Sequence, residues 1–305
     1  MENEYTNIRK FETSQNTTMI TFPNAKINIG LNITEKRPDG FHNIETAMYP
    51  LKGILFDALE VIAVPRPLTP TLSSGEGGGT AKLHISGNLI PGNPYNNLCI
   101  KAYDLIRKDY PQVPPIDIHL HKAIPIGAGF GGGSSDGAFF IRLLSEKFEL
   151  GISWGEMHNY ARQLGSDCSF FVSNKPAFAE GKGDQLESIN LDLSGYYIAL
   201  VCPDIHVNTA EAYAGVKPKK THRSLEKDIQ KLPVSQWKKY IYNDFEESIF
   251  QKYPEIKKIK EKLYLMGAIY ASMSGSGSAV YGIFKKAINL KSKFINCQVW
   301  EGRLT

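Results

Sequence analysis

The sequence predicts an α+β fold with two lobes. Strand-like segments dominate its first part, helical segments follow over residues 224–266, and two strands return over residues 268–284. Strands and helices that are grouped in this way, rather than alternating, are typical of α+β proteins. A chain of 305 residues also has the length of about two domains. We therefore expect domains over residues 1–185 and 186–305.

The first elements follow from a simple alternation. Residues 25–33 place apolar side chains at 27, 29, 31 and 33, with Lys26 and Asn28 on the opposite face, so they predict a half-buried strand. A Pro38-Asp39-Gly40 turn precedes an extended segment that reaches residue 51, and residues 54–64 predict another strand. The proline- and glycine-rich residues 65–80 predict a surface loop. We expect the first ordered stretch to begin near residue 17.

The middle of the chain predicts helices on either side of a glycine-rich segment. Residues 98–109 predict a helix, and residues 116–121 alternate as a strand does. Glycine-rich residues 125–137 then pass into an apolar helix. Ser153 and Glu156 have the spacing of a capping box, so a further helix is expected to begin there and to end at Gly165. Residues 177–189 predict a hairpin, and residues 196–201 predict a buried strand.

The last part of the chain predicts helices followed by a short pair of strands. Ile256, Ile259, Leu263 and Met266 recur at helical spacing, which is typical of a helix face packed on a core. Strands are expected over 268–273 and 279–284. Between them lies a second glycine–serine loop, residues 274–278.

Composition excludes several classes of protein. The net charge is +4, which is too small to indicate a nucleic-acid partner. No apolar run reaches about 18 residues, and the polar N-terminus does not resemble a signal peptide, so we expect no membrane partner. The four cysteines are widely separated: Cys99, Cys168, Cys202 and Cys297. This spacing indicates neither a disulfide framework nor a zinc site, and it favours a cytoplasmic protein.

The first glycine-rich segment predicts a phosphate-binding loop. Residues 127–133 hold five glycines and lead into a helix. Backbone N–H groups can converge in such a loop, and the helix N-terminus adds partial positive charge. The segment formally matches a dinucleotide-binding fingerprint, but the second strand of that unit is missing. A Walker A loop is excluded because Ser134, rather than lysine, follows the last glycines.

Two further residues are candidates for phosphoryl-transfer chemistry. Lys26 projects from the polar face of the first strand and could hold a phosphate or a reacting hydroxyl. Asp167 follows a helix end and could take the proton of an acceptor alcohol, since phosphoryl transfer needs positioning, charge neutralisation and a proton acceptor. Asp136 is a second candidate base, although we expect it to support the helix N-terminus.

Three motifs together resemble the GHMP kinases: the lysine-bearing N-terminal motif, the glycine- and serine-rich loop and the C-terminal glycine-rich motif. Within that superfamily, five segments resemble one branch more closely. These are Pro23–Leu31, Arg37–His42, Gly129–Ser135, Gly165–Asp167 and Phe178–Gly181. Asp39-Gly40-Phe41-His42 is the most specific element, because it marks the branch of the family that binds cytidine. The chain has Phe41 where tyrosine is more usual, and Gly-Ser-Asp-Cys-Ser where the family has Gly-Ala-Asp-Val-Pro. The resemblance covers residues 20 to 284.

The resemblance implies a GHMP-kinase-like fold with an N-terminal nucleotide-binding lobe and a C-terminal substrate lobe. It implies ATP with Mg²⁺ as co-substrate and a cytidine diphosphate-linked alcohol as acceptor. It assigns catalysis to Lys26 and Asp167, and substrate binding to Asn28, Phe41, His42 and Thr209. The ATP-binding residues that it implies are Pro125, Ile126, Gly127, Ala128, Gly129, Phe130, Gly131, Gly132, Gly133, Ser134 and Ser135, with Asn97, Leu98 and Lys122 at the adenine.

Three other functions remain open from the sequence. The chain could be a mevalonate-type or homoserine kinase, for which a substrate without cytidine would be the test. It could be a nucleotide-binding regulator without turnover, although both candidate catalytic residues are present. A basic surface could bind a partner, although we expect it to be solvated: Lys217, Lys219, Lys220, Arg223, Lys227, Lys238 and Lys239. We expect no tightly bound cofactor or protein metal site, and a monomer or weak homodimer.

Overall fold

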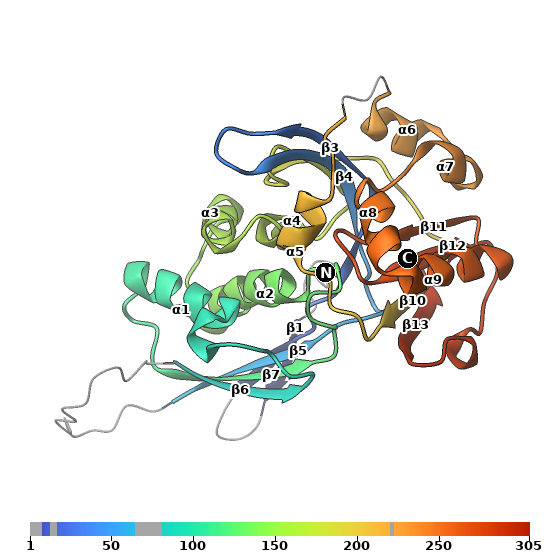
Figure 1. Cartoon of the computed structure of the whole chain (residues 1–305). Coiled ribbons are helices and arrows are strands. Elements are labelled where there is room, and N and C mark those ends of the chain that lie inside the picture. Colours follow the sequence, from blue (N-terminus) through green and yellow to red (C-terminus); the bar gives the residue numbers. More distant parts are fainter. Residues whose placement is uncertain (1–7, 13–16, 65–80, 220–222) are drawn as a thin grey trace. The chain divides into compact units, whose positions relative to one another are not determined.

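The computed structural model describes residues 8–12, 17–64, 81–219 and 223–305 (Figure 1). The expected loop at 65–80 and Lys220 lie outside the described residues. The chain packs as two compact units, each built from separated stretches. Unit 1 contains residues 1–23, 56–124 and 133–172, and unit 2 contains residues 24–55, 125–132 and 173–305. The predicted domains, residues 1–185 and 186–305, stay a prediction.

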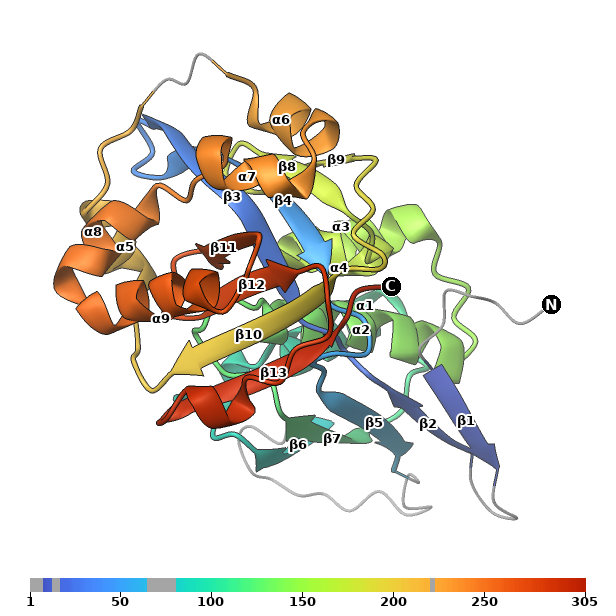
Figure 2. The same cartoon turned by 90° about the vertical axis from the view of Figure 1, so that its right-hand side faces the viewer.

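Unit 1 is a sheet with helices on one face. Among the described residues its strands have the order β1-β2-β5-β7-β6, with β6 and β7 parallel and the other neighbours antiparallel. The strands are β1 (Ile8–Glu12), β2 (Thr17–Thr21), β5 (Ala58–Ala63), β6 (Ala81–Gly87) and β7 (Ile116–Lys122). The helices are η1 (Pro94–Asn96), α1 (Leu98–Asp109), α2 (Gly132–Lys147), α3 (Trp154–Leu164) and α4 (Cys168–Ser173). Figures 1 and 2 both show α1 and α2 along one sheet face.

Unit 2 contains two sheets and the C-terminal helices. One sheet has the order β3-β4-β8-β9 and the other β11-β12-β10-β13. Their strands are β3 (Lys26–Lys36), β4 (His42–Pro50), β8 (Ala177–Glu180), β9 (Gln185–Ser188), β10 (Tyr197–Pro203), β11 (Tyr270–Met273), β12 (Val280–Phe284) and β13 (Cys297–Arg303). The helices are α5 (Thr209–Ala214), α6 (Leu225–Lys231), α7 (Val234–Tyr240), α8 (Phe245–Lys252), α9 (Pro254–Leu265) and η2 (Lys291–Lys293).

The α+β prediction is confirmed, and most elements lie close to their predicted limits. The capping box forms as expected, since the Ser153 side chain accepts from the backbone N–H of Glu156 and the Glu156 carboxylate accepts from that of Ser153. Ile256, Ile259 and Leu263 are buried on the inner face of α9. That face packs against β11 and β12, which explains its helical spacing of apolar residues.

Three expectations about strands are wrong. Order begins before residue 17, because β1 pairs with β2 in an antiparallel register. β5 begins at Ala58 rather than residue 54. β3 is buried on both faces along its first eight residues rather than half-buried. Its polar side chains, including Lys26 and Asn28, are therefore buried and need polar partners.

Candidate active site

Lys26 and Asn28 form a buried polar pair on one face of β3. They are two residues apart, so the strand directs both side chains to the same side. The Lys26 ammonium donates to Asn28 Oδ1 at 2.5 Å, and Asn28 Nδ2 donates to Thr46 Oγ1 on β4 at 3.2 Å. The Lys26 side chain is 4% exposed. The lysine is thus held in one direction, as a group that must contact a reacting oxygen should be.

The first glycine loop is joined directly to this strand. The carbonyl of Phe130 accepts a hydrogen bond of 3.0 Å from the backbone N–H of Lys26. Gly127, Gly129 and Gly131 have φ angles of +69°, +84° and +70°, which L side chains rarely adopt. Helix α2 begins at the end of this loop, so its unpaired N–H groups and dipole favour an anion there.

The second glycine loop, residues 274–278, packs against the first within unit 2. Ser274 Oγ donates to the Gly129 carbonyl at 2.8 Å and accepts from the Asn28 N–H at 3.3 Å. The N–H of Ala279 donates to the Ala128 carbonyl at 3.2 Å. A Cβ on Gly129 would lie 1.9 Å from the Ser274 carbonyl oxygen. The contact therefore requires glycine, and it ties both loops to β3.

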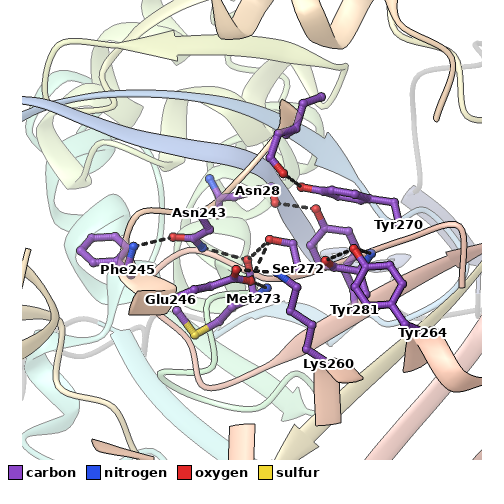
Figure 3. A network of polar contacts seen from close by, with 12 residues as sticks. Asn28, Asn243, Phe245, Glu246, Lys260, Tyr264, Tyr270, Ser272, Met273 and Tyr281 are labelled. Atoms are coloured by element: carbon purple, nitrogen blue, oxygen red, sulfur yellow. Dashed lines mark hydrogen bonds and ion pairs between the residues drawn. The ribbon is translucent and has the colours of Figure 1, made fainter. Parts of the chain in front are cut away.

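A network of polar side chains around α8 and α9 supports the second loop (Figure 3). Asn243 Nδ2 donates to the carbonyls of Met273 and Gly275 at 2.9 and 2.8 Å. Glu246 accepts from the Met273 N–H at 2.8 Å and from the Lys260 ammonium at 2.5 Å. Sequence analysis found this glycine–serine loop but gave it no role. Asn243 was missed because its partners are distant in sequence and no local pattern marks it, and Ser274 was placed in the loop without a role of its own.

Tyr281 adds a further support to the same strand. Its hydroxyl donates to the Asn28 carbonyl at 2.9 Å, and Tyr281 is fully buried on β12 (Figure 3). Burial raises the pKa of Tyr281 well above its usual value, so the hydroxyl stays a donor. The backbone of β3 is therefore fixed by the first glycine loop at Lys26, and by the second glycine loop and β12 at Asn28.

Phe41 and His42 lie where the turn after β3 enters β4. The Phe41 side chain is 59% exposed, and the Lys182 ammonium lies 5.0 Å from its ring centroid. The His42 ring stacks on Tyr213 of α5, with centroids 4.9 Å apart and 19° between the ring planes. Burial, with a smaller effect of Lys36, lowers the pKa of His42. A neutral imidazole offers one donor and one acceptor to a nucleobase edge.

Thr209 and Tyr213 both come from α5. Thr209 is its first residue, and Thr209 Oγ1 lies 3.4 Å from Ser276 Oγ in the second glycine loop. Sequence analysis named Thr209 and missed Tyr213. A single aromatic residue in a short helix carries no signal of its own, and its pairing with His42 appears only in three dimensions.

Asn97, Leu98, Ser134, Ser135 and Asp167 belong to unit 1. Asn97 caps α1, with Oδ1 accepting from the N–H of Cys99 at 2.9 Å. The start of α1 lies close to α2, because a Cβ on Gly137 would be 3.0 Å from Leu98 Cβ. The structure thus brings the predicted adenine residues Asn97 and Leu98 beside the helix that follows the phosphate loop.

Asp167 and Lys26 belong to different units, so their roles as a catalytic pair stay a prediction. Asp167 is half-buried and lies immediately before α4. The preceding helix α3 ends at Leu164, with the N–H of Gly165 bonded to the Ala161 carbonyl. The aspartate therefore stands in a short turn between two helices.

The Lys122 ammonium is occupied inside unit 1. It donates to Asp57 Oδ2 and, at 2.7 Å, to Asp136 Oδ2. Burial raises the pKa of Asp136 well above its usual value, against the opposing effect of Lys122. Asp136 is 2% exposed and is held by this ammonium, which favours Asp167 over Asp136 as the base. Sequence analysis missed Asp57 completely.

Several basic residues of the third open function have local partners in unit 2. Arg223 pairs with Asp228 at 2.8 Å, and Lys219 lies 3.5 Å from Glu247. Lys238 lies over the Tyr264 ring at 4.2 Å. These neighbours favour the solvated face. Within the described part of the chain, no group of three histidine, cysteine or acidic residues could hold a metal ion, and no helix is long and apolar enough to cross a membrane.

Comparison with known proteins places these features in one family. The model of the GHMP kinases N terminal domain matches residues 97–175, and that of the GHMP kinases C terminal domain matches residues 224–297. A Bacteroides fragilis protein named 4-diphosphocytidyl-2-C-methyl-D-erythritol kinase is 51% identical over 266 residues, which cover 87% of this chain and 92% of that protein. A Parabacteroides distasonis protein of the same name is 47% identical over 290 residues, covering 94% and 100%.

Solved structures share the fold. A crystal structure of 4-(cytidine 5'-diphospho)-2C-methyl-D-erythritol kinase aligns with a TM-score of 0.73 and 27% identity, covering 93% of this chain and 98% of that one. The Methanococcus jannaschii mevalonate kinase aligns with a TM-score of 0.62 and 16% identity, covering 95% and 99%. At that identity the second likeness is one of fold alone.

Proposed function

This chain belongs to the GHMP kinases, and from that membership we propose that it transfers the γ-phosphoryl group of ATP to the 2-hydroxyl of 4-diphosphocytidyl-2-C-methyl-D-erythritol. The family resemblance predicted from the sequence is confirmed, and the family uses ATP as co-substrate. The reaction belongs to the non-mevalonate route to isoprenoid precursors. A cytoplasmic location, the absence of a nucleic-acid partner and a monomer or weak homodimer remain predictions.

One observation carries the proposal. Lys26 is bonded through its backbone to the first glycine loop and through its side chain to Asn28. Asn28 is bonded through its backbone to Ser274 of the second loop. A cation, an amide and a phosphate-type loop are thus held in one rigid part of unit 2, as transfer of a phosphoryl group to an alcohol requires.

The residues take complementary roles in the reaction. Asp167 accepts the proton of the 2-hydroxyl, and Lys26 contacts the same oxygen and stabilises the charge that develops on it. Asn28 orients this hydroxyl. The N–H groups of Pro125 to Ser135, apart from the proline, hold the phosphates. Mg²⁺ that arrives with ATP neutralises charge on the transferred phosphate.

The two bases of the substrates bind at different places. Phe41 provides an exposed flat ring for the cytosine, and His42 presents its ring nitrogens to the base edge, supported by stacking on Tyr213. Asn97, Leu98 and Lys122 line the adenine site, where the Asn97 amide Nδ2 is the group that can donate to a ring nitrogen. Thr209 contacts the acceptor from the start of α5.

The direct test is release of ADP from Mg·ATP with and without the cytidine diphosphate-linked methylerythritol. Release that depends on this alcohol supports the proposal. Release with mevalonate or homoserine, but not with the cytidine compound, would contradict the cytidine assignment and keep the kinase. ATP binding without release, whichever alcohol is added, would instead favour a regulator.

Asp167→Asn tests the assignment of the base. The variant keeps the shape of the side chain but cannot accept the proton, so kcat should fall by roughly 10²–10⁴-fold while ATP affinity changes little. The measurement is steady-state turnover together with direct binding of ATP. The exposed Asp192→Asn is the matched control and should keep wild-type kinetics. Near-normal turnover in Asp167→Asn would remove Asp167 from this role.

A further inference from the structure

Three ionisable side chains form a buried cluster in unit 1, Asp57, Lys122 and Asp136. Their exposed fractions are 0%, 2% and 2%. Asp57 stands just before β5, Lys122 is the last residue of β7, and Asp136 lies near the start of α2. The Lys122 ammonium bridges the carboxylates, since it donates to an oxygen of each. Burial by itself would lower the pKa of Lys122, and the two carboxylates more than reverse this, so the pKa is raised and the ammonium stays charged.

The cluster lies at both ends of the first glycine loop. Asp57 Oδ1 accepts from the N–H groups of Ala123 and Ile124, at 2.6 and 2.8 Å. These are the last two residues before the chain leaves unit 1 for the loop. The chain re-enters unit 1 at Gly133, and Asp136 follows within α2. Asp57 therefore binds the start of the loop directly, at Ala123 and Ile124. It is connected to the end of the loop through Lys122, which also binds Asp136.

We propose that Asp57 is a positioning residue of the nucleotide site, which fixes the two ends of the phosphate-binding loop relative to each other. The proposal rests on the proposed function in one respect, that this loop holds the phosphates of ATP. Phosphate binding by backbone N–H groups depends on their convergence, and a loop whose ends are free to separate loses that convergence. Asp57 touches neither the nucleotide nor the acceptor in this account.

The two carboxyl groups of the cluster differ in their hydrogen bonding. Asp57 accepts three donors, one from Lys122 and two from the backbone. Asp136 accepts from Lys122 through Oδ2, while its buried Oδ1 has no partner. The titratable groups that face Asp136 are Lys122, Asp57 and Cys99, on three different elements. Asp136 accepts fewer hydrogen bonds than Asp57 and its pKa is raised by burial, so Asp136 is the carboxyl that carries a proton.

This assignment leaves the cluster without net charge. One ammonium and one carboxylate balance, and the neutral Asp136 accepts one hydrogen bond. Two ionised carboxylates would instead leave a buried negative charge in the helix that begins at the phosphate loop, which would oppose an ATP anion. The two aspartates should consequently respond in opposite ways to replacement by asparagine.

The experiment measures ATP binding without the acceptor, so that its outcome does not depend on which alcohol the enzyme uses. Asp57→Asn keeps an oxygen for Ala123 and Ile124 but loses the charged bond to Lys122, and Asp57→Ala loses both. We expect the Kd of ATP to rise about tenfold in Asp57→Asn and further in Asp57→Ala. Asp136→Asn mimics the neutral acid and should keep the Kd within about twofold. The KM of the acceptor should stay within about twofold in all three.

Asp109→Asn is the matched control, because Asp109 accepts a 2.7 Å hydrogen bond from Tyr160 in the same unit and contacts no part of the loop. It should bind ATP as the wild type does. Amide hydrogen exchange gives a second readout, in which residues 123–124 should exchange faster in Asp57→Asn than in Asp109→Asn. If Asp57→Asn does not fold, Asp57→Glu keeps a charge opposite Lys122 but displaces the carboxylate from the N–H groups of Ala123 and Ile124, and it should fold while binding ATP weakly.

Two results would overturn the proposal. Equal ATP affinity in the folded Asp57 and Asp109 variants would show that the cluster supports the fold alone. An equal loss of affinity in Asp57→Asn and Asp136→Asn would show that both carboxylates are ionised and equivalent. Failure of the proposed phosphotransfer looks different, because ATP would then bind normally in the wild type and no product would form.

Discussion

The two glycine loops of this protein are held in place by opposite means. The ends of the first loop are tied together by three buried ionisable groups in unit 1, of which Lys122 and Asp57 are charged. The second loop is held in unit 2 largely by neutral groups, the Asn243 amide and the Ser274 hydroxyl, with Glu246 as an additional acceptor. Removing one partner from a buried ion cluster leaves an uncompensated charge, whereas loss of a neutral partner leaves only an unsatisfied polar group, which costs less. Removal of the Lys122 or Asp57 charge should therefore be far more damaging than loss of a neutral group at the second loop.

The largest effect is expected for Lys122→Met. The change leaves Asp57 and Asp136 facing each other in the core without a cation, and removal of one partner from a buried ion cluster costs about 3–5 kcal/mol. The free energy of unfolding, measured in urea at neutral pH, should fall by that amount. The exposed Lys252→Met, which breaks a surface ion pair with Glu211, is the control and should cost under about 1 kcal/mol. Similar losses in both variants would contradict the contrast between buried and exposed charge.

The same cluster should make stability depend on pH through Asp136. Burial raises the pKa of Asp136 in the folded protein, so the folded protein binds this proton more tightly than the unfolded chain does. The stability that this group contributes is complete at pH values below its unfolded pKa, and it is lost as pH rises toward the folded pKa. Asp136→Asn cannot release a proton, so its stability relative to the wild type should increase with pH.

Urea unfolding of the wild type and Asp136→Asn between about pH 5.5 and about pH 8.5 measures this difference, since other groups titrate equally in both proteins. Asn243→Asp at the second loop serves as the comparison, because its new carboxylate faces two carbonyl oxygens and should destabilise the fold more as it ionises. A difference between wild type and Asp136→Asn that is independent of pH would show that Asp136 does not bind a proton in the fold.

The same contrast explains what could be predicted from the sequence. The alternation in β3, the capping box of α3 and the first glycine loop depend on neighbours within a few residues, and each was predicted close to its observed place. Asp57 and Asn243 could not be found in this way. Asp57 is 65 residues from Lys122, and Asn243 is 30 residues from Met273. A single charged or amide residue carries no periodic signal, so its role appears when the chain has folded.

The prediction that β3 is half-buried was wrong for a related reason. Alternation of Ile27 and Ile29 with Lys26 and Asn28 predicts one solvated face. That face is covered in unit 2 by the second glycine loop, since the Asn28 Oδ1 would lie 3.3 Å from a Cβ on Gly275. A strand that carries functional polar groups toward a loop has the same pattern as a strand that carries them toward water.

An intermediate effect is expected for Asn243→Ala at the second loop. The change leaves the carbonyls of Met273 and Gly275 without this donor and the N–H of Phe245 without its acceptor. Buried polar groups that lose their partner cost about 1–3 kcal/mol, so the free energy of unfolding should fall by roughly 2 kcal/mol. Asn208→Ala, which removes the exposed cap of α5, is the control at about 1 kcal/mol. A loss as large as that of Lys122→Met would contradict the comparison of the two loops.

The smallest effect on stability is expected for Ser274→Ala. The hydroxyl donates to the Gly129 carbonyl and accepts from the Asn28 N–H, and loss of neutral bonds of this kind costs about 1 kcal/mol. The fall in kcat of Ser274→Ala should be larger than this loss of stability would cause. The hydroxyl aligns Asn28 of β3, two residues from Lys26, with Gly129 of the first loop. Ser276→Ala is the matched control for stability, because Ser276 lies in the same loop, is half-buried and bonds only to Thr209 among the described hydrogen bonds. A fall in kcat that is explained entirely by the smaller fraction of folded protein would show that the second loop supports the fold without aligning the catalytic strand. The two loops would then differ in function as well as in the interactions that hold them.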